Sequence, residues 1–92
     1  MPEKLKETSL LSMMKETGAF LEGHFRLTSG LHSGHYMQCA LLLSVPRYAE
    51  HAGRELAACL ASLNPGAVFA PALGGLIIGH EVARHLDVPF YF

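Results

Sequence analysis

The spacing of apolar and polar residues changes several times along the chain, and each change predicts an element. Residues 3–17 carry leucine and methionine near helical spacing, with lysine and glutamate between them, which predicts an amphipathic helix ending at Gly18. Residues 19–27 alternate loosely and predict a strand. Residues 28–34 are polar and glycine-rich and predict a turn, after which residues 35–43 predict a second strand.

The chain continues with a long helical pattern over residues 44–63. Pro46 lies near its start, where a missing N–H group costs little, and residues 64–66, Asn-Pro-Gly, end it. The predicted apolar stripe of this helix consists of Tyr48, Ala52, Leu56, Cys59 and Leu63.

The last quarter of the chain has the pattern of a β-α-β unit. Residues 67–70 are continuously apolar, as in a strand buried on both faces of a parallel sheet. Residues 76–86 predict a helix, and residues 88–92 predict a further strand in which the chain ends. An end inside an apolar strand is what a truncated domain would show. We therefore expect an incomplete α/β fold.

Composition supports this expectation. Half of the 92 residues are apolar and 16% are charged, which is little charge for so small a chain. We expect some of this apolar surface to be covered by a partner or by further chain. The net charge of −1 shows no basic cluster, which argues against a nucleic-acid partner. No apolar run reaches the roughly 18 residues of a membrane span.

The cysteines and the start of the chain bear on its location. Cys39 and Cys59 lie in apolar surroundings, and the polar opening of the chain lacks the apolar segment of a secretory signal. This combination predicts reduced, buried thiols in a cytoplasmic protein.

The strongest candidate site is the segment 70–75, Ala-Pro-Ala-Leu-Gly-Gly, between the predicted buried strand and the following helix. Glycines let the backbone approach a ligand, and free N–H groups at a helix start favour an anion. Ligands also bind at the carboxyl ends of parallel strands. The segment matches neither a dinucleotide fingerprint nor a P-loop. The alternative is that its glycines serve only close packing of helix against strand.

A second candidate spans residues 25–30, followed by Ser33 and Tyr36. It combines backbone donors, hydroxyl groups and an aromatic face, which suit a small planar polar ligand. The alternative is an ordinary turn with a core tyrosine. His80 and His85 superficially match a zinc-protease helix, but a spacing of five residues points them in different directions, so we expect no metal site there.

Together these segments resemble orotate phosphoribosyltransferase. Residues 18–33 are similar to the N-terminal hood of that family and carry its F-x-L-x-S-G-x-x-S pattern, which residues 36–40 continue. Residues 70–84 are similar to its pyrophosphate-loop segment and the helix that follows. The resemblance implies a hood over residues 1–45, then the first β-α-β unit of a type I phosphoribosyltransferase parallel-sheet core over residues 46–92.

The resemblance also implies a reaction and its site. The family transfers a phosphoribosyl group from phosphoribosyl pyrophosphate to orotate, with Mg²⁺, and is dimeric. By position, the orotate site would contain Thr28, Ser29, Tyr36 and Met37. The pyrophosphate would bind the backbone N–H groups of Leu73, Gly74 and Gly75. The resemblance places no catalytic residue and no metal ligand within this chain.

The sequence departs from the family in two ways. Many members have lysines at the positions of Thr28 and Gly74. The acidic pair and Thr-Gly-Gly loop that hold the ribose phosphate, and the mobile basic loop, are expected beyond Phe92. We therefore expect the chain to be inactive alone. The alternative function is a small non-catalytic α/β domain that binds an anion or a protein partner.

Overall fold

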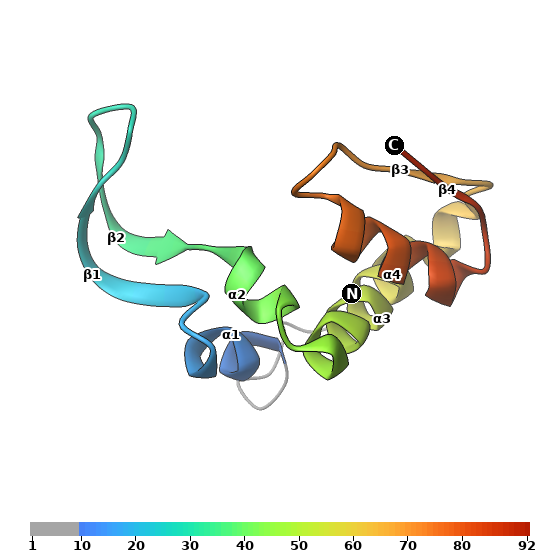
Figure 1. Cartoon of the computed structure of the whole chain (residues 1–92), viewed down its shortest axis with the longest axis horizontal. Coiled ribbons are helices and arrows are strands. Elements are labelled where there is room, and N and C mark those ends of the chain that lie inside the picture. The colour runs from blue at the N-terminus through green and yellow to red at the C-terminus, as the bar shows by residue number, and fades with distance from the viewer. Residues whose placement is uncertain (1–9) are drawn as a thin grey trace. The chain divides into compact units, whose positions relative to one another are not determined.

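The computed structural model describes residues 10–92, which form two compact units, 10–42 and 43–92. Figure 1 shows the chain coloured from its N-terminus to its C-terminus. Within the described residues no helix combines the length and apolar character needed to cross a membrane. The predicted helix over residues 3–17 lies partly outside the described range, and its described part is α1, Ser12–Glu16.

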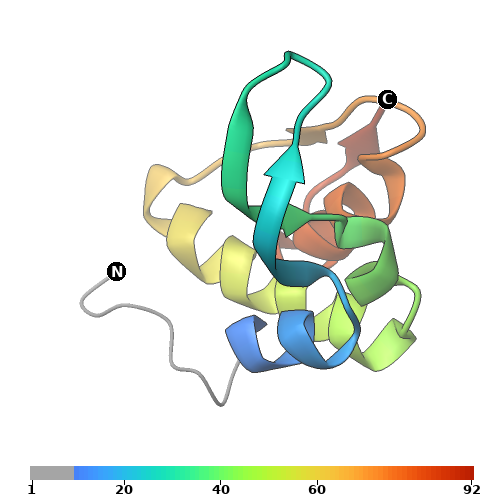
Figure 2. The same cartoon turned by 90° about the vertical axis from the view of Figure 1, so that its left-hand side faces the viewer.

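Unit 10–42 is built on a β-hairpin, whose strands are visible in Figure 2. Gly18 follows α1 with φ of 80°, a left-handed conformation that favours glycine, and turns the chain into β1, Phe20–Arg26. Strand β1 pairs antiparallel with β2, His32–Met37, and Phe20 lies opposite Met37. The predicted first strand is confirmed. The second strand begins three residues earlier than predicted.

Residues 39–43 contradict the predicted strand, which was to continue to residue 43. They form a short helix, α2, Cys39–Leu43. The ladder ends where the Gln38 N–H group donates to the Ala19 carbonyl at 2.8 Å, and the Gln38 carbonyl then accepts from Leu41 N–H at 3.1 Å. A short apolar run fits a strand or a helix equally well by periodicity, and leucine and alanine favour the helix.

Unit 43–92 contains the predicted β-α-β arrangement. Helix α3 spans Pro46–Leu60 and continues into a 3₁₀ turn, Ala61–Leu63. Strand β3, Val68–Phe69, pairs parallel with β4, Phe90–Tyr91, and helix α4, Leu76–Leu86, connects them. The parallel pair confirms the order of elements predicted from the sequence.

The buried face of α3 differs from the predicted stripe. The helix buries small residues, Ala49, Ala52, Gly53 and Ala57, and it packs on α4. The larger Leu56 and Leu63 are exposed, so of the predicted stripe only Ala52 is fully buried. Small side chains occupy the buried face of α3 because they let the two helices approach closely.

Two further expectations about burial are wrong. Cys39 and Cys59 are free, as expected, but both are exposed. Cys59 lies two residues after buried Ala57 and therefore points to the other side of α3. Phe69 was expected to be buried on a two-faced strand, yet its side chain is 75% exposed. Within unit 43–92 the open face of the small sheet carries this ring and that of Tyr91, with centroids 5.2 Å apart.

Candidate functional site

The segment 70–75 forms a tight turn between β3 and α4, as the sequence predicts. Gly75 N–H donates to the Pro71 carbonyl at 2.8 Å, and Leu76 N–H donates to the Leu73 carbonyl at 3.0 Å. Among the described residues, no hydrogen bond uses the N–H groups of Leu73 or Gly74. Two of the three predicted pyrophosphate donors therefore remain available, while the third, at Gly75, is already engaged within the turn.

The two glycines of this turn have different roles. A β-carbon at Gly75 would lie 2.8 Å from the Pro71 carbonyl oxygen and 2.9 Å from the Ala70 β-carbon, so only glycine fits. A β-carbon at Gly74 would meet nothing within 4 Å. The packing explanation considered for the sequence thus accounts for Gly75 alone. Gly74 is exposed and leaves its backbone open to a ligand.

The turn suits an anion. Its free N–H groups precede the start of α4, where the dipoles of the helix place partial positive charge. Leu73 is 83% exposed, so its side chain points into solvent and does not cover the backbone of the turn. No acidic side chain occurs in residues 67–80, so nothing in the segment repels a phosphate.

The other candidate segment is the hairpin turn between β1 and β2. Leu27 N–H donates to the Leu31 carbonyl at 2.8 Å, and Gly30 N–H donates to the Leu27 carbonyl at 2.8 Å. Gly30 has φ of 91°, which explains glycine at this position. Thr28 and Ser29 are exposed at the tip of this turn.

Tyr36 and Met37 lie at the opposite end of the hairpin. Their register partners are Leu21 and Phe20, at the base of β1. The Tyr36 ring packs against Phe25 with centroids 5.7 Å apart and remains 42% exposed, which leaves an aromatic surface for a planar ligand. Within the hairpin, the structure does not bring these two residues together with the threonine and serine at the tip.

The histidines of α4 point to different neighbours. His80 meets the edge of the Phe90 ring with centroids 6.1 Å apart, whereas His85 Nε2 lies 3.0 Å from Glu50 Oε2 on α3. The two rings therefore serve separate contacts within unit 43–92.

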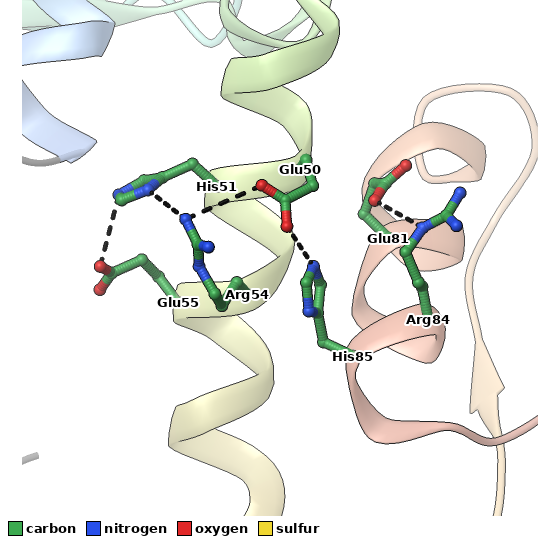
Figure 3. A network of polar contacts seen from close by, with 7 residues as sticks. All are labelled: Glu50, His51, Arg54, Glu55, Glu81, Arg84 and His85. Atoms are coloured by element: carbon green, nitrogen blue, oxygen red, sulfur yellow. Dashed lines mark hydrogen bonds and ion pairs between the residues drawn. The ribbon is translucent and has the colours of Figure 1, made fainter.

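A polar network joins α3 and α4 and was not expected from the sequence (Figure 3). On α3, Arg54 contacts His51 Nδ1 at 3.0 Å and Glu50 at 3.8 Å, while His51 lies 3.4 Å from Glu55. The Glu50–His85 contact crosses from α3 to α4. The i, i+4 spacings on α3 were a usable signal, but only the helix packing reveals the crossing.

A second group missed by the sequence is a pair of touching histidines on the hairpin, His24 and His32. The register pair of His32 is Arg26, so His24 reaches His32 only through the irregular register between Glu22 and Phe25. Because the contact depends on this cross-strand register, no local pattern in the sequence indicates it.

Known proteins are similar to this chain in sequence. Over 79 residues, 86% of its length, the chain is 52% identical to the orotate phosphoribosyltransferase of Pelotomaculum thermopropionicum. The chain is also 46% identical to the orotate phosphoribosyltransferase of Thermotoga petrophila over 80 residues, which are 87% of this chain. The chain is homologous to orotate phosphoribosyltransferases. It spans 42% and 43% of these two relatives, which is less than half of each. No protein-family model matches it.

Solved structures agree with the homology. The orotate phosphoribosyltransferase of Aeropyrum pernix matches 89% of this chain and 51% of its own, with a TM-score of 0.67 and 29% identity. The UMP synthase of Leishmania donovani matches 95% of this chain and 20% of its own, with a TM-score of 0.81 and 22% identity, which supports the fold alone. The fold of the chain is thus the one found in the corresponding part of orotate phosphoribosyltransferases, the type I phosphoribosyltransferase fold.

Proposed function

We propose that the chain is the N-terminal portion of an orotate phosphoribosyltransferase. The whole enzyme would transfer the 5-phosphoribosyl group of phosphoribosyl pyrophosphate to N1 of orotate, giving orotidine monophosphate and pyrophosphate for pyrimidine synthesis. The observation that carries the proposal is the identity of 40–52% with enzymes of this name over at least 86% of the chain. Sequence similarity along most of the chain implies that it forms the corresponding part of the same kind of enzyme.

In this proposal the turn before α4 binds the pyrophosphate. The N–H groups of Leu73 and Gly74 donate to phosphate oxygens, and the start of α4 stabilises their charge. This charge increases on the leaving group as the bond to the ribose breaks. Fixed donors aimed at the leaving group therefore lower the barrier more than they stabilise the ground state.

The hairpin would contribute to the orotate site. Tyr36 offers its exposed ring face to the planar base, and Met37 adds an adaptable apolar contact. The hydroxyl groups of Thr28 and Ser29, at the far end of the hairpin, would contact polar groups elsewhere on the bound substrates. Without the lysine common at the position of Thr28, this contact relies on neutral hydrogen bonds.

Residues 27–49, which follow β1, and residues 67–80, which contain the turn before α4, do not fit a direct role in holding Mg²⁺. This ion prefers oxygen ligands and usually binds through carboxylates and substrate phosphates. Neither residues 27–49 nor residues 67–80 contain an aspartate or glutamate. In the proposal, Mg²⁺ is a partner of phosphoribosyl pyrophosphate, and its protein ligands lie outside both segments.

We further propose that the enzyme is a cytoplasmic homodimer and that this chain is inactive without the rest of it. Free, exposed thiols at Cys39 and Cys59 suit a reducing compartment. Exposed rings at Phe69, Tyr91 and Phe92 suit a chain that packs against more protein.

Nuclear magnetic resonance tests the assignment of the turn. The chain, labelled with nitrogen-15, is titrated with phosphoribosyl pyrophosphate and Mg²⁺. The expected result is saturable shifts of the Leu73 and Gly74 amide signals, while Gly66, an exposed glycine before β3, stays unchanged and serves as the control. Uniform small shifts over the whole chain, or shifts confined to other segments, would contradict the assignment.

A further inference from the structure

Two histidine rings touch on the β1–β2 hairpin. His24 Nε2 lies 2.6 Å from His32 Nδ1, and the rings meet edge to face with centroids 4.8 Å apart. So short a separation requires one nitrogen to carry a proton and the other to offer a lone pair. Both residues are exposed, so the pair is accessible from solution.

A bulge in β1 creates the contact. The ladder register shifts between Glu22 and Phe25, where β1 contains one residue more than β2. Gly23 and His24 therefore face the single residue Gly34. Gly23 has φ of 157°, and a bulge of this kind changes the direction of the side chain that follows.

The register also explains why the two rings share a face. Gly34 lies opposite the bulge, and His32 precedes it by two residues, which places His32 diagonally across from His24. Because glycine occupies positions 23 and 34, these two positions place no side chain of their own beside the rings. The result is an open hollow of about 210 Å³, lined by the two histidines, both glycines and Ser33.

We propose that His24 and His32 chelate a late first-row transition-metal ion, such as Zn²⁺, Ni²⁺ or Cu²⁺. Neutral imidazole is a favoured ligand of these ions, and two ring nitrogens here converge from adjacent strands. His24 would bind through Nε2 and His32 through Nδ1, with the proton of each ring on its other nitrogen. The ring that donates in the hydrogen bond changes tautomer, and no proton is released overall.

The geometry requires only a small adjustment. Zinc–nitrogen bonds of ~2.0–2.1 Å at a tetrahedral angle place two ligand atoms about 3.3 Å apart. The two nitrogens, now 2.6 Å apart, must therefore separate by about 0.7 Å, which exposed rings achieve by rotating. Water completes the coordination. With two protein ligands, we expect binding in the micromolar range and weaker than at a structural zinc site with four.

Neighbouring charges modulate the site. Arg26 is the register partner of His32 and places a positive charge on the same face, which opposes metal binding. Glu22 lies 4.0 Å from His35 at the next pair beyond the bulge. The chelating pair brackets the 27–31 turn, so a bound ion would tie the strands together directly below Thr28 and Ser29 and restrict that turn.

The test is calorimetric titration of the chain with zinc chloride, with the histidine ring signals followed by nuclear magnetic resonance. The expected result is one ion per chain, with ring shifts confined to His24 and His32. His24→Gln and His32→Gln should each weaken binding by more than about tenfold, since losing even an outer-sphere group typically costs that much. His80→Gln, on α4, is the matched control and should bind as the parent does.

Arg26→Gln supplies an independent check, because removal of the opposing charge should tighten binding if the pair is the site. Unchanged amide spectra away from the hairpin establish that each variant is folded. Absence of binding at millimolar zinc, binding that survives His24→Gln, or binding that is lost in His80→Gln would each overturn the proposal. The measurement uses the metal alone and is independent of any transferase activity.

Discussion

Gly53 on α3 packs directly against the backbone of Glu81 on α4. A β-carbon at position 53 would lie 2.8 Å from the Glu81 carbonyl carbon, and closer still to its β-carbon. Backbone atoms cannot move aside as the end of a flexible side chain can. The separation of the two helices is therefore set by the absence of a side chain at this position.

Gly53→Ala is expected to destabilise the chain. Alanine improves helix propensity by up to ~1 kcal/mol, but overpacking of a tight contact costs about 1–3 kcal/mol, so the net effect is a loss. Urea unfolding measures it as a lower midpoint. Gly66→Ala is the control, because a β-carbon there meets nothing within 4 Å. Equal midpoints for the two variants would contradict the close packing of α3 on α4.

Substitution of the two glycines before α4 should change stability by different amounts, for the same steric reason. Gly75→Ala must displace the Pro71 carbonyl or Ala70 and should lose about 1–3 kcal/mol of unfolding free energy. Gly74→Ala meets open space, keeps its N–H group and should change stability by less than about 0.5 kcal/mol. Chemical denaturation of both variants checks this. A larger loss in Gly74→Ala than in Gly75→Ala would refute the division of roles.

Most of the second half of the chain could be predicted from its sequence. Helix α4 spans Leu76–Leu86 as predicted, since its start follows two glycines and its end precedes Asp87 in a left-handed conformation. The buried face of α3 could not be predicted from hydrophobicity, because close contact with α4 selects small residues over the larger Leu56.

In the hairpin, a different feature could not be predicted from the sequence. Its strands and turn follow from alternation and glycine placement, but the bulge at Gly23 and His24 depends on cross-strand register, which no local pattern specifies. For this reason the sequence indicated no role for the two histidines that meet there. It also could not show that Tyr36 and Thr28 lie at opposite ends of one hairpin.

The Glu50–His85 contact should depend on salt. The atoms are 3.0 Å apart, but His85 Nε2 has no aligned hydrogen-bond acceptor, so the attraction depends on a positively charged imidazole. A double-mutant cycle with Glu50→Gln and His85→Gln should give a coupling of up to ~1 kcal/mol, because the pair is only partly buried.

High salt should reduce the coupling between Glu50 and His85, because dissolved ions screen a partly exposed charge pair. His80→Gln, combined with Glu50→Gln, is the control cycle and should show no coupling. A coupling that is independent of salt concentration would contradict an electrostatic origin.

Association is expected of the isolated chain. Phe69, on β3, is 75% exposed, and Phe92, directly after β4, is 82% exposed. Among the described residues, no further strand pairs with the edges of the β3–β4 sheet. Burial of about 500 Å² of apolar surface per chain contributes roughly 12 kcal/mol at ~25 cal/mol/Å². Association costs ~4–15 kcal/mol, so apolar burial alone leaves the balance undecided, and pairing of free strand edges tips it toward association. Light scattering at micromolar concentration should show a dimer or larger species. A monomer of 10.0 kDa throughout would contradict this.

The central claim is that this chain supplies the N-terminal part of an orotate phosphoribosyltransferase. The direct measurement joins it to the remaining C-terminal part of the Pelotomaculum thermopropionicum enzyme, its 52% identical relative, and follows orotidine monophosphate formation from orotate, phosphoribosyl pyrophosphate and Mg²⁺. We expect turnover by the joined protein and none by either part alone. A folded joined protein that forms no product, or turnover by the 92-residue chain alone, would contradict it.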